Sequence, residues 1–276
     1  MAIHEESPES SLERLRESAQ KIEREQILYP LVFSVVGIIA WTGIVELFDL
    51  PLYILPTPFQ ILDGFAAEMS FFAPHAQATI FEAFFGWVVG NIIGVTLGLV
   101  MAESRGLRIS FYPYLIALRS IPVIAFAPLL ILWMGLNVWP ILATATITTF
   151  FPTLVNSIAG FNSTDQLTEE LMHSLDASRW QVFRHVKIYN AMPYIFSSLK
   201  ITVALSMIGA VVGEWLAADQ GLGYLIVVAN NQIDTILLFR SIILIGLFGT
   251  AWFALLTVTE RLFLDWKQTG DAGATR

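Results

Sequence analysis

Residues Gln166–Pro193 read QLTEELMHSLDASRWQVFRHVKIYNAMP and form the longest polar interruption between apolar segments after the N-terminal tail. A leucine recurs every fourth residue in the first half, the spacing of one helical face, and a second short apolar face follows. The members of the two faces are Leu167, Leu171, Leu175, Trp180, Phe183 and Val186. Ser178 suits the N-cap of a second helix. The pattern predicts a helix, a turn and a second helix at a membrane surface, with the stretch ending at Pro193. A partner protein can bind the chain at this helix–turn–helix.

The rest of the chain is too apolar for a soluble protein. Of 276 residues, 55% are hydrophobic and 14% are charged, which indicates one membrane domain. The absence of cysteine excludes disulfides and thiolate metal sites. A formal net charge of −8 argues against nucleic acid as a partner. The predicted fold class is therefore all-α and polytopic, with the lipid bilayer around it.

Six apolar runs have about the 20 residues that a bilayer core requires. The predicted spans are residues 27–47, 79–102, 112–134, 138–158, 194–216 and 235–257, and continuation of the last helix toward Trp266 is left open. The membrane domain is thus residues 27–267, between polar tails at 1–26 and 268–276. The N-terminal tail is either a helix lying on the membrane or on a partner, or a solvated, frayed segment.

Two short helices are predicted outside the spans. One begins at Thr57-Pro58, a cap followed by proline at the first turn, and the other covers residues 222–233. The apolar face expected for the first comprises Phe59, Leu62, Phe65 and Ala66.

Lys and Arg are distributed unevenly between alternate loops. Loops 48–78, 135–137 and 217–234 contain none, whereas the tails and the other two loops carry most of the fifteen. Because positive charge marks the cytoplasmic side, both termini and the stretch 166–193 are predicted to be cytoplasmic.

Small residues and prolines characterise the spans. Gly86, Gly90, Gly94 and Gly98 lie on one helical face, which predicts close packing against another helix of the same subunit, in preference to a dimer seam. Pro122 and Pro128 predict kinks in the third span. Hydroxyls at Thr144, Thr146, Thr148 and Thr149 can bind a solute or, more commonly, carbonyls of their own helix.

Several ionisable residues fall in or near the spans, where charge is costly. Arg119 can attract an anionic solute or tie a kinked backbone together, and both interpretations stay open. Glu82 and Glu214 lie near the outer ends, where a solvated interfacial role is expected. The histidines His4, His75, His173 and His185 are assigned to solvated tails and loops.

No enzyme motif is present. The sequence lacks GxxxxGK[ST], HExxH and CxxC, so the chain is expected to bind neither ATP nor a cofactor or metal of its own.

The stretch 166–193 resembles the coupling loop of permease subunits of bacterial ABC importers. Glu170 matches the signature glutamate, Leu171 and Met172 replace its two alanines, and Asp176 stands at its glycine. Three further runs, Ala177–Phe183, Arg119–Gly135 and Gly213–Trp215, are similar to the nitrate/sulfonate/taurine branch. The resemblance covers about residues 51–266 and implies a type I importer permease in a bacterial inner membrane.

This resemblance also implies partners and sites. The partners are a second permease subunit, expected to be identical, two cytoplasmic ATPase subunits that bind the ATP, and an extracytoplasmic solute-binding protein. The ATPase-coupling residues are Leu167, Glu170, Leu171, Met172, Leu175, Asp176, Ala177 and Arg179. The candidate pathway residues are Arg119, Pro122, Thr149, Asn156 and Glu214.

The solute and two alternative functions stay open at this stage. The solute is expected to be small and polar or anionic, and residues 121–125 and 149–152 resemble relatives assigned to pyrimidine precursors or riboflavin. A secondary transporter or channel would need coupling carboxylates at mid-membrane, which the sequence lacks. A membrane scaffold would leave the cytoplasmic helix–turn–helix without a role.

Overall fold

The computed structural model describes residues 8–263, with side chains from residue 28 onward except those of Arg119 and His173. This part of the chain is helical and contains no strand. The chain divides into two units, residues 1–63 and 64–276. The helices are α1 (Pro8–Leu47), α2 (Pro58–Leu62), α3 (Met69–Glu103), α4 (Arg105–Arg119), α5 (Ala127–Met134), α6 (Val138–Phe161), α7 (Gln166–Ser174), α8 (Arg179–Val182), α9 (Ile188–Ala217), α10 (Leu222–Gln232) and α11 (Thr235–Phe263).

The first unit consists of α1 and α2. The predicted tail helix and first span form one continuous helix, α1. Thr57 caps α2 through a capping box with Gln60, as its sequence indicates. The predicted helix is shorter than expected: Phe59 and Leu62 lie in it and are exposed, Ile61 is buried, and the helix ends at Leu62. Its C-cap, Asp63, is extended, and Gly64 then takes a positive φ of 70°, so Phe65 and Ala66 lie beyond it.

Five helical segments of the described chain are long and apolar enough to cross a membrane, and a bent pair raises the number to six. The second span begins at Met69, ten residues before the predicted start. Its added turns are held by packing, because Phe72 and Ala76 are buried with Leu222, Leu225 and Leu244 of α10 and α11.

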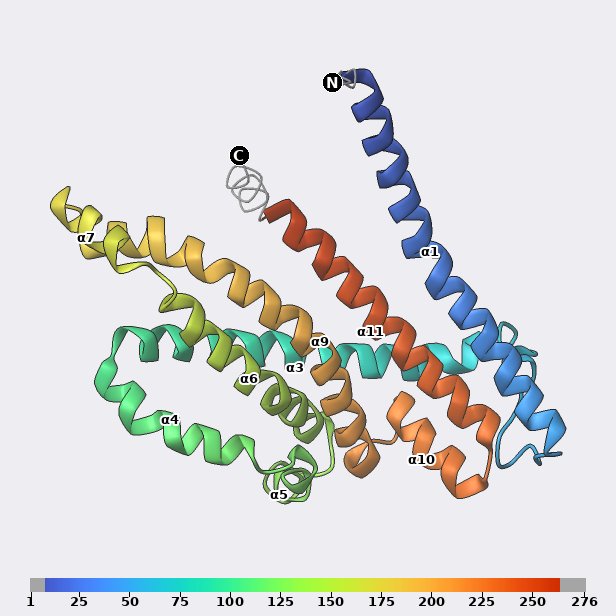
Figure 1. Cartoon of the computed structure of the whole chain (residues 1–276). Helices are drawn as coiled ribbons and strands as arrows, with labels where there is room; N and C mark the ends of the chain where they lie inside the picture. The colour runs from blue at the N-terminus through green and yellow to red at the C-terminus, as the bar shows by residue number, and fades with distance from the viewer. Residues whose placement is uncertain (1–7, 264–276) are drawn as a thin grey trace. The chain divides into compact units, whose positions relative to one another are not determined.

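Helices α3, α6 and α9 form the centre of the second unit (Figure 1). Gly86, Gly90, Gly94 and Gly98 of α3 face, in order, Ala145, Thr149, Thr153 and Ser157 of α6, and a Cβ on any of the four glycines would fall closer than 3.0 Å to its neighbour. The predicted packing within the subunit is confirmed. The two runs of small residues let the backbones approach closely, which favours helix association in lipid.

A buried polar contact joins all three helices. Asn91 Oδ1 on α3 accepts hydrogen bonds from Thr153 Oγ1 of α6 at 2.6 Å and from Thr202 Oγ1 of α9 at 3.2 Å. Most threonine hydroxyls on α6 bond to carbonyls of their own helix, as expected: Thr144 to Pro140, Thr148 to Ala145, and Thr149 to Ala145 and Thr146.

The third span is broken, which differs from the single kinked helix predicted. Helix α4 ends at Arg119, a 3₁₀ turn covers Val123–Ala125, and α5 begins at Ala127, with a bend of 83° between the two halves. Pro122 lies at the break, whereas Pro128 sits in the first turn of α5, where a missing N–H is tolerated. Because the α3–α6 contacts advance in the same direction along both helices, the two are parallel, and α4–α5 must return the chain across the membrane.

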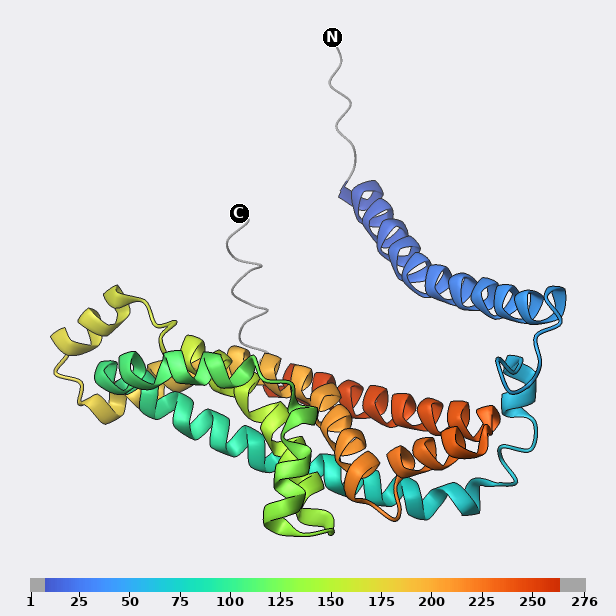
Figure 2. The same cartoon turned by 90° about the horizontal axis from the view of Figure 1, so that it is seen from below.

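The fifth span is longer than predicted. Pro193 lies inside α9, and α8, a π-helical turn at Phe183–Lys187 and α9 run together as a 39-residue segment, Arg179–Ala217. The prediction that the polar stretch ends at Pro193 is therefore wrong, because helical turns lie on both sides of the proline. Helices α10 and α11 confirm the predicted short helix and sixth span; residues 264–276 lie outside the described part. In Figures 1 and 2, α7 and α10 lie at opposite ends of the second unit.

Candidate functional site

The helix–turn–helix predicted at residues 166–193 is present as α7 and α8, here called the hairpin. Helix α7 ends at Ser174, and the chain turns through Asp176, which takes the left-handed φ of 55°. Ala177 N–H donates to Met172 O at 3.0 Å, which ties down the end of α7. Ser178 caps α8 through a capping box with Gln181. Both expectations for the turn, an aspartate in place of glycine and a serine cap, are confirmed.

The leucine stripe of the hairpin is uncovered. Leu167, Leu171 and Leu175 are 72%, 59% and 69% exposed, on a helix too short to enter a bilayer. Of the other predicted coupling residues, Glu170, Asp176 and Arg179 are exposed, and Met172 and Ala177 are half-buried. Trp180 is also exposed and lies 5.5 Å, between ring centroids, from Phe183. Aligned leucines beside charged groups are typical of a surface that another protein covers.

Ion pairs anchor the hairpin to the spans. Lys187 Nζ lies 2.7 Å from Glu103 Oε1, at the end of α3, and 3.7 Å from Glu169 Oε1 on α7. Within α7, Gln166 Nε2 donates to Glu170 Oε1 at 2.8 Å. Lys187, which directly precedes α9, thus links α7 to the end of α3.

Asp176→Val is expected to loosen the hairpin. A β-branched residue at a positive φ costs about 1–2 kcal/mol more than glycine, so amide hydrogen exchange across residues 166–182 should accelerate several-fold. Asp176→Gly is the matched control and should keep the slow exchange. Equal exchange in the valine and glycine variants would show that the turn conformation is not what orders the hairpin.

The candidate pathway residues occupy separate environments. Arg119 is the last residue of α4, and Pro122 precedes the 3₁₀ turn. Thr149 is fully buried between α3 and α6, and Asn156 donates from Nδ2 to the carbonyl of Pro152 at 2.9 Å. Glu214 lies near the end of α9 and bonds to α10. The four of these residues whose side chains the structure describes do not form one cluster.

Glu214 holds the start of α10, in an arrangement here called the α10 clasp. Its Oε2 accepts hydrogen bonds from the N–H groups of Gly223 at 2.5 Å and Tyr224 at 3.3 Å. Two α3 side chains complete the clasp: Gly221 N–H donates to His75 Nδ1 at 3.0 Å, and Leu222 N–H donates to Thr79 Oγ1 at 2.8 Å. Each N–H at this helix start, which lacks an intrahelical partner, is thus satisfied by a side chain.

The clasp corrects two sequence expectations. Glu82 and Glu214 are 5% and 1% exposed, so a solvated interfacial role is wrong for both, and His75 lies inside α3, not in a loop. A carboxylate is stabilised beside free N–H groups at a helix start, which explains the burial of Glu214. The glycines of Gly221-Leu222-Gly223 are a sequence signal for this role of Glu214 at the start of α10. A Cβ on Gly223 would lie 2.7 Å from Glu214 Oε2, so only glycine lets the carboxylate come this close.

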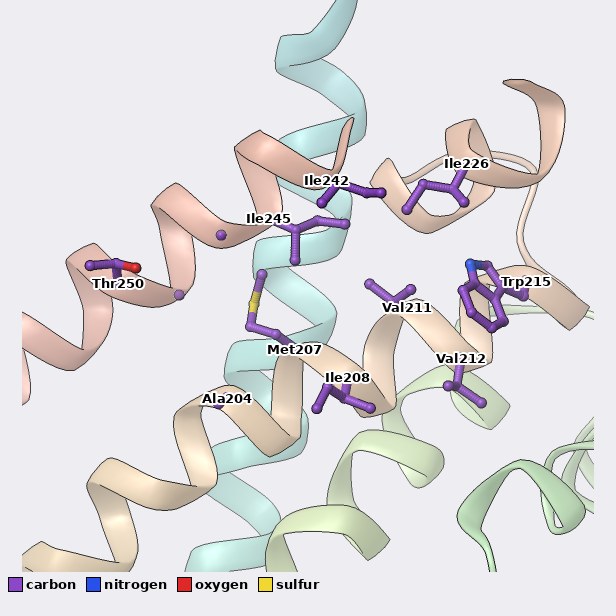
Figure 3. Close-up of a pocket in the computed structure, with 12 residues that line it drawn as sticks. Ala204, Met207, Ile208, Val211, Val212, Trp215, Ile226, Ile242, Ile245 and Thr250 are labelled. Carbon is purple, nitrogen blue, oxygen red and sulfur yellow. The ribbon is translucent and has the colours of Figure 1, made fainter. Parts of the chain in front are cut away.

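Two cavities in this unit differ in character. A groove of about 450 Å³ between α9, α10 and α11 is lined almost wholly by apolar side chains, among them Met207, Val211, Ile226 and Ile245, with Thr250 at one end (Figure 3). It offers a polar solute little to bind. The second cavity, of about 530 Å³, is lined by Glu82, Asn137, Ile141, Asp219 and Gln220 and is here called the acidic pocket.

The chain has clear relatives. Residues 90–266 match the family described as binding-protein-dependent transport system inner membrane component. The formylaminopyrimidine transport permease protein ThiX of Halalkalibacterium halodurans is 34% identical, over 88% of this chain and 97% of the relative. The riboflavin transport system permease protein RibX of Chloroflexus aurantiacus is 32% identical, over 91% and 94%.

More distant relatives and a solved structure agree. Permeases named for aliphatic sulfonate and taurine transport, from Bacillus subtilis and Escherichia coli, match at 26–28% identity. The MetNI methionine ABC transporter in an inward-facing conformation superposes with a TM-score of 0.55 at 16% identity, over 69% of this chain and 98% of that one. This likeness shows the type I importer fold. The chain therefore belongs to the binding-protein-dependent transport system inner membrane components and is a permease subunit of an ABC importer, close to the nitrate/sulfonate/taurine type.

Proposed function

We propose that two copies of this chain form the membrane channel of the importer, with one cytoplasmic ATPase docked on each hairpin and an extracytoplasmic binding protein delivering the solute. The exposed leucine stripe carries the proposal, because Leu167, Leu171 and Leu175 form an i, i+4 set that fits an apolar groove in a partner. ATP is bound by the partner subunits, since the sequence lacks a phosphate-binding loop of its own.

Both termini and the hairpin lie in the cytoplasm under this proposal, and α10 lies on the outer side. The uneven loop charge supports this orientation. The parallel course of α3 and α6 supports the number of crossings, because the segment between them must then cross the membrane.

Reporter fusions check the orientation. An enzyme reporter active only outside the inner membrane is expected to be active when fused after residue 227, in α10, and silent after residue 180, in α8. A reporter active only in the cytoplasm should give the opposite pattern at the same two positions. Reversal of both signals would contradict the proposed topology.

The solute is proposed to be a small polar nitrogen heterocycle. The relatives at 34% and 32% identity are named for formylaminopyrimidine and riboflavin transport, whereas those named for sulfonate and taurine transport stand at 26–28%. Three described cations of the second unit, Lys187, Lys200 and Arg240, pair with Glu103, Glu260 and Glu68, respectively, and are less available to a sulfonate for that reason.

Purification and uptake together test the proposal. Isolated from its own cells in mild detergent, the permease should retain an ATPase of the ABC class in equal stoichiometry, with ATP hydrolysis. In proteoliposomes supplied with the binding protein and ATP, the complex should take up labelled formylaminopyrimidine or riboflavin and leave taurine outside. Uptake without an ATPase would reject the importer model, and preferential taurine uptake would reject the solute class.

A further inference from the structure

The α10 clasp contains a histidine whose protonation state is set by its hydrogen bond. Gly221 N–H donates to His75 Nδ1 at 3.0 Å, and a backbone N–H can act only as a donor. His75 Nδ1 must therefore be unprotonated, so the ring is neutral and carries its hydrogen on Nε2. The side chain is half-buried, and its ring lies nearly parallel to that of Tyr224, with 6.2 Å between the centroids. The clasp thus depends on the neutral form of a group that water can reach.

Protonation of His75 removes the acceptor from this contact. In the imidazolium ion both ring nitrogens are donors, so the new hydrogen on Nδ1 would point at the hydrogen of Gly221 N. Gly221 has little space in which to move, because it packs against the carboxyl group of Glu214 so closely that a Cβ there would overlap it. The contact is therefore lost, and Thr79 and Glu214 alone hold the start of α10.

A pair of buried carboxyl groups lies at the same clasp. Glu82 of α3 and Glu214 of α9 are 5% and 1% exposed and lie within hydrogen-bonding reach of each other. Two carboxylates cannot form a hydrogen bond unless one of them carries a proton, so the pair shares one proton and keeps one negative charge. An imidazolium at His75 would attract this charge away from the N–H groups of Gly223 and Tyr224, which Glu214 Oε2 now accepts.

The other titratable or charged groups around the clasp come from the elements that pack beside it. Asp219 follows α9, is exposed and lines the acidic pocket with Glu82, and α10 contributes the phenol of Tyr224. On α11, Arg240 pairs with Glu68 at 2.6 Å. Among these types of side chain, only histidine has an ordinary pKa between about pH 5 and 8. Acidification through this range is therefore expected to act on His75.

We propose that the α10 clasp is a pH-sensitive switch, which is closed while His75 is neutral and opens at the start of α10 when His75 takes up a proton. The closed state is favoured above the pH at which His75 titrates and is lost as the pH falls through it. The clasp lies at the end of the second unit opposite the hairpin, so its exposure to extracytoplasmic pH rests on the proposed orientation (Figure 2). Opening would release α10 from the segment Arg179–Ala217, which leads to the hairpin.

Hydrogen exchange of the α10 amides in the purified permease–ATPase complex tests the switch. After correction for the intrinsic pH dependence of exchange, wild-type amides 221–226 should exchange about fivefold faster at about pH 5.5 than at about pH 7.5. His75→Asn offers an amide oxygen near the position of Nδ1 and takes up no proton in this range, so it should exchange slowly at both pH values. His75→Leu has no acceptor and should exchange fast at both. His185→Asn, at an exposed position just after α8, is the matched control and should behave like the wild type.

Each result decides the proposal. Equal exchange of wild-type α10 at the two pH values would overturn it, and so would an acid response that persists in His75→Asn. Amides of α6 are the internal reference, and their acceleration together with α10 would mean that acid unfolds the whole unit and that no switch exists.

A further variant decides if those at His75 do not assemble. Glu82→Gln can donate to Glu214 in place of the shared proton, so it should keep the acid response confined to α10. Loss of the response in Glu82→Gln would assign it to the carboxyl pair and overturn the role of His75. These measurements need neither a solute nor an orientation in the membrane, so their failure would leave the proposed function standing.

Discussion

Gly90→Leu is expected to prevent assembly of the second unit. A Cβ at this position would already lie 2.6 Å from the carbonyl oxygen of Thr146, and closer still to the Thr149 hydroxyl. Rotation of the Thr149 side chain cannot relieve the clash with Thr146, because that contact is to the backbone. Helices α3 and α6 must therefore separate along the whole run of small residues. Overpacking of this kind costs roughly 3 kcal/mol or more, a large fraction of the stability of a domain.

The measurement is the yield of monodisperse complex in mild detergent, together with its thermal unfolding. Gly246→Leu is the matched control, because a Cβ on Gly246 of α11 meets nothing within 4 Å. The control should give a near-normal yield, whereas Gly90→Leu should give little or none. Gly94→Leu should behave like Gly90→Leu, since its Cβ would lie 2.8 Å from Thr153 Cβ. Equal yields from all three would refute the close-packing role of the glycines.

Leu171→Asp is expected to release the ATPase from an otherwise intact permease. Leu171 is the middle member of the leucine stripe, flanked one turn away on each side by Leu167 and Leu175. If a groove of the ATPase covers the stripe, the variant loses the burial of the leucine side chain in that groove. In addition, the charged carboxylate of the aspartate must be desolvated when the ATPase binds. The combined cost is about 3 kcal/mol, roughly 150-fold in the dissociation constant.

Co-purification and ATP-driven uptake both report this release. Gln166→Asp adds the same charge to α7 outside the leucine stripe and serves as the control; it should retain the ATPase. The Leu171→Asp permease should keep its thermal stability, because the side chain is exposed in the isolated chain. Full association and transport in this variant would mean that the hairpin is not the coupling element.

Elements with local signals could be predicted from the sequence. Four evenly spaced glycines predicted a close helix contact within the subunit, which the structure shows to be with α6, and Ser178, Asp176 and Thr57 predicted the turn of the hairpin and the start of α2. In each case the residue type has a conformational or steric reason to be where it is. The α4–α5 break could be predicted only in part, because a proline indicates a kink in a helix but does not give its angle.

Features that depend on distant contacts were missed. Helix α3 extends back to Met69 because α10 and α11 cover Phe72, and no property of residues 69–78 alone shows this. Glu82 and Glu214 were assigned to solvent since a carboxylate near the end of a span is usually hydrated. The burial of Glu214 depends on α10 folding back so that its first N–H groups meet Glu214, His75 and Thr79. The candidate pathway residues were chosen by type, and hydrogen bonds to carbonyls of their own helix already engage Thr149 and Asn156.

The 39-residue helical segment Arg179–Ala217 connects the two ends of the unit without a break in the backbone. At 1.5 Å per residue it is about 58 Å long, and Glu214 stands three residues from one end while Ser178 caps the other. If this segment tilts as one body about its contact with α6, its two ends move in opposite directions. A tilt of about 5° displaces each tip by roughly 2.5 Å, in opposite directions. That displacement is comparable to a hydrogen-bond length, so a tilt of this size that α10 does not follow would break the bonds between Glu214 and α10.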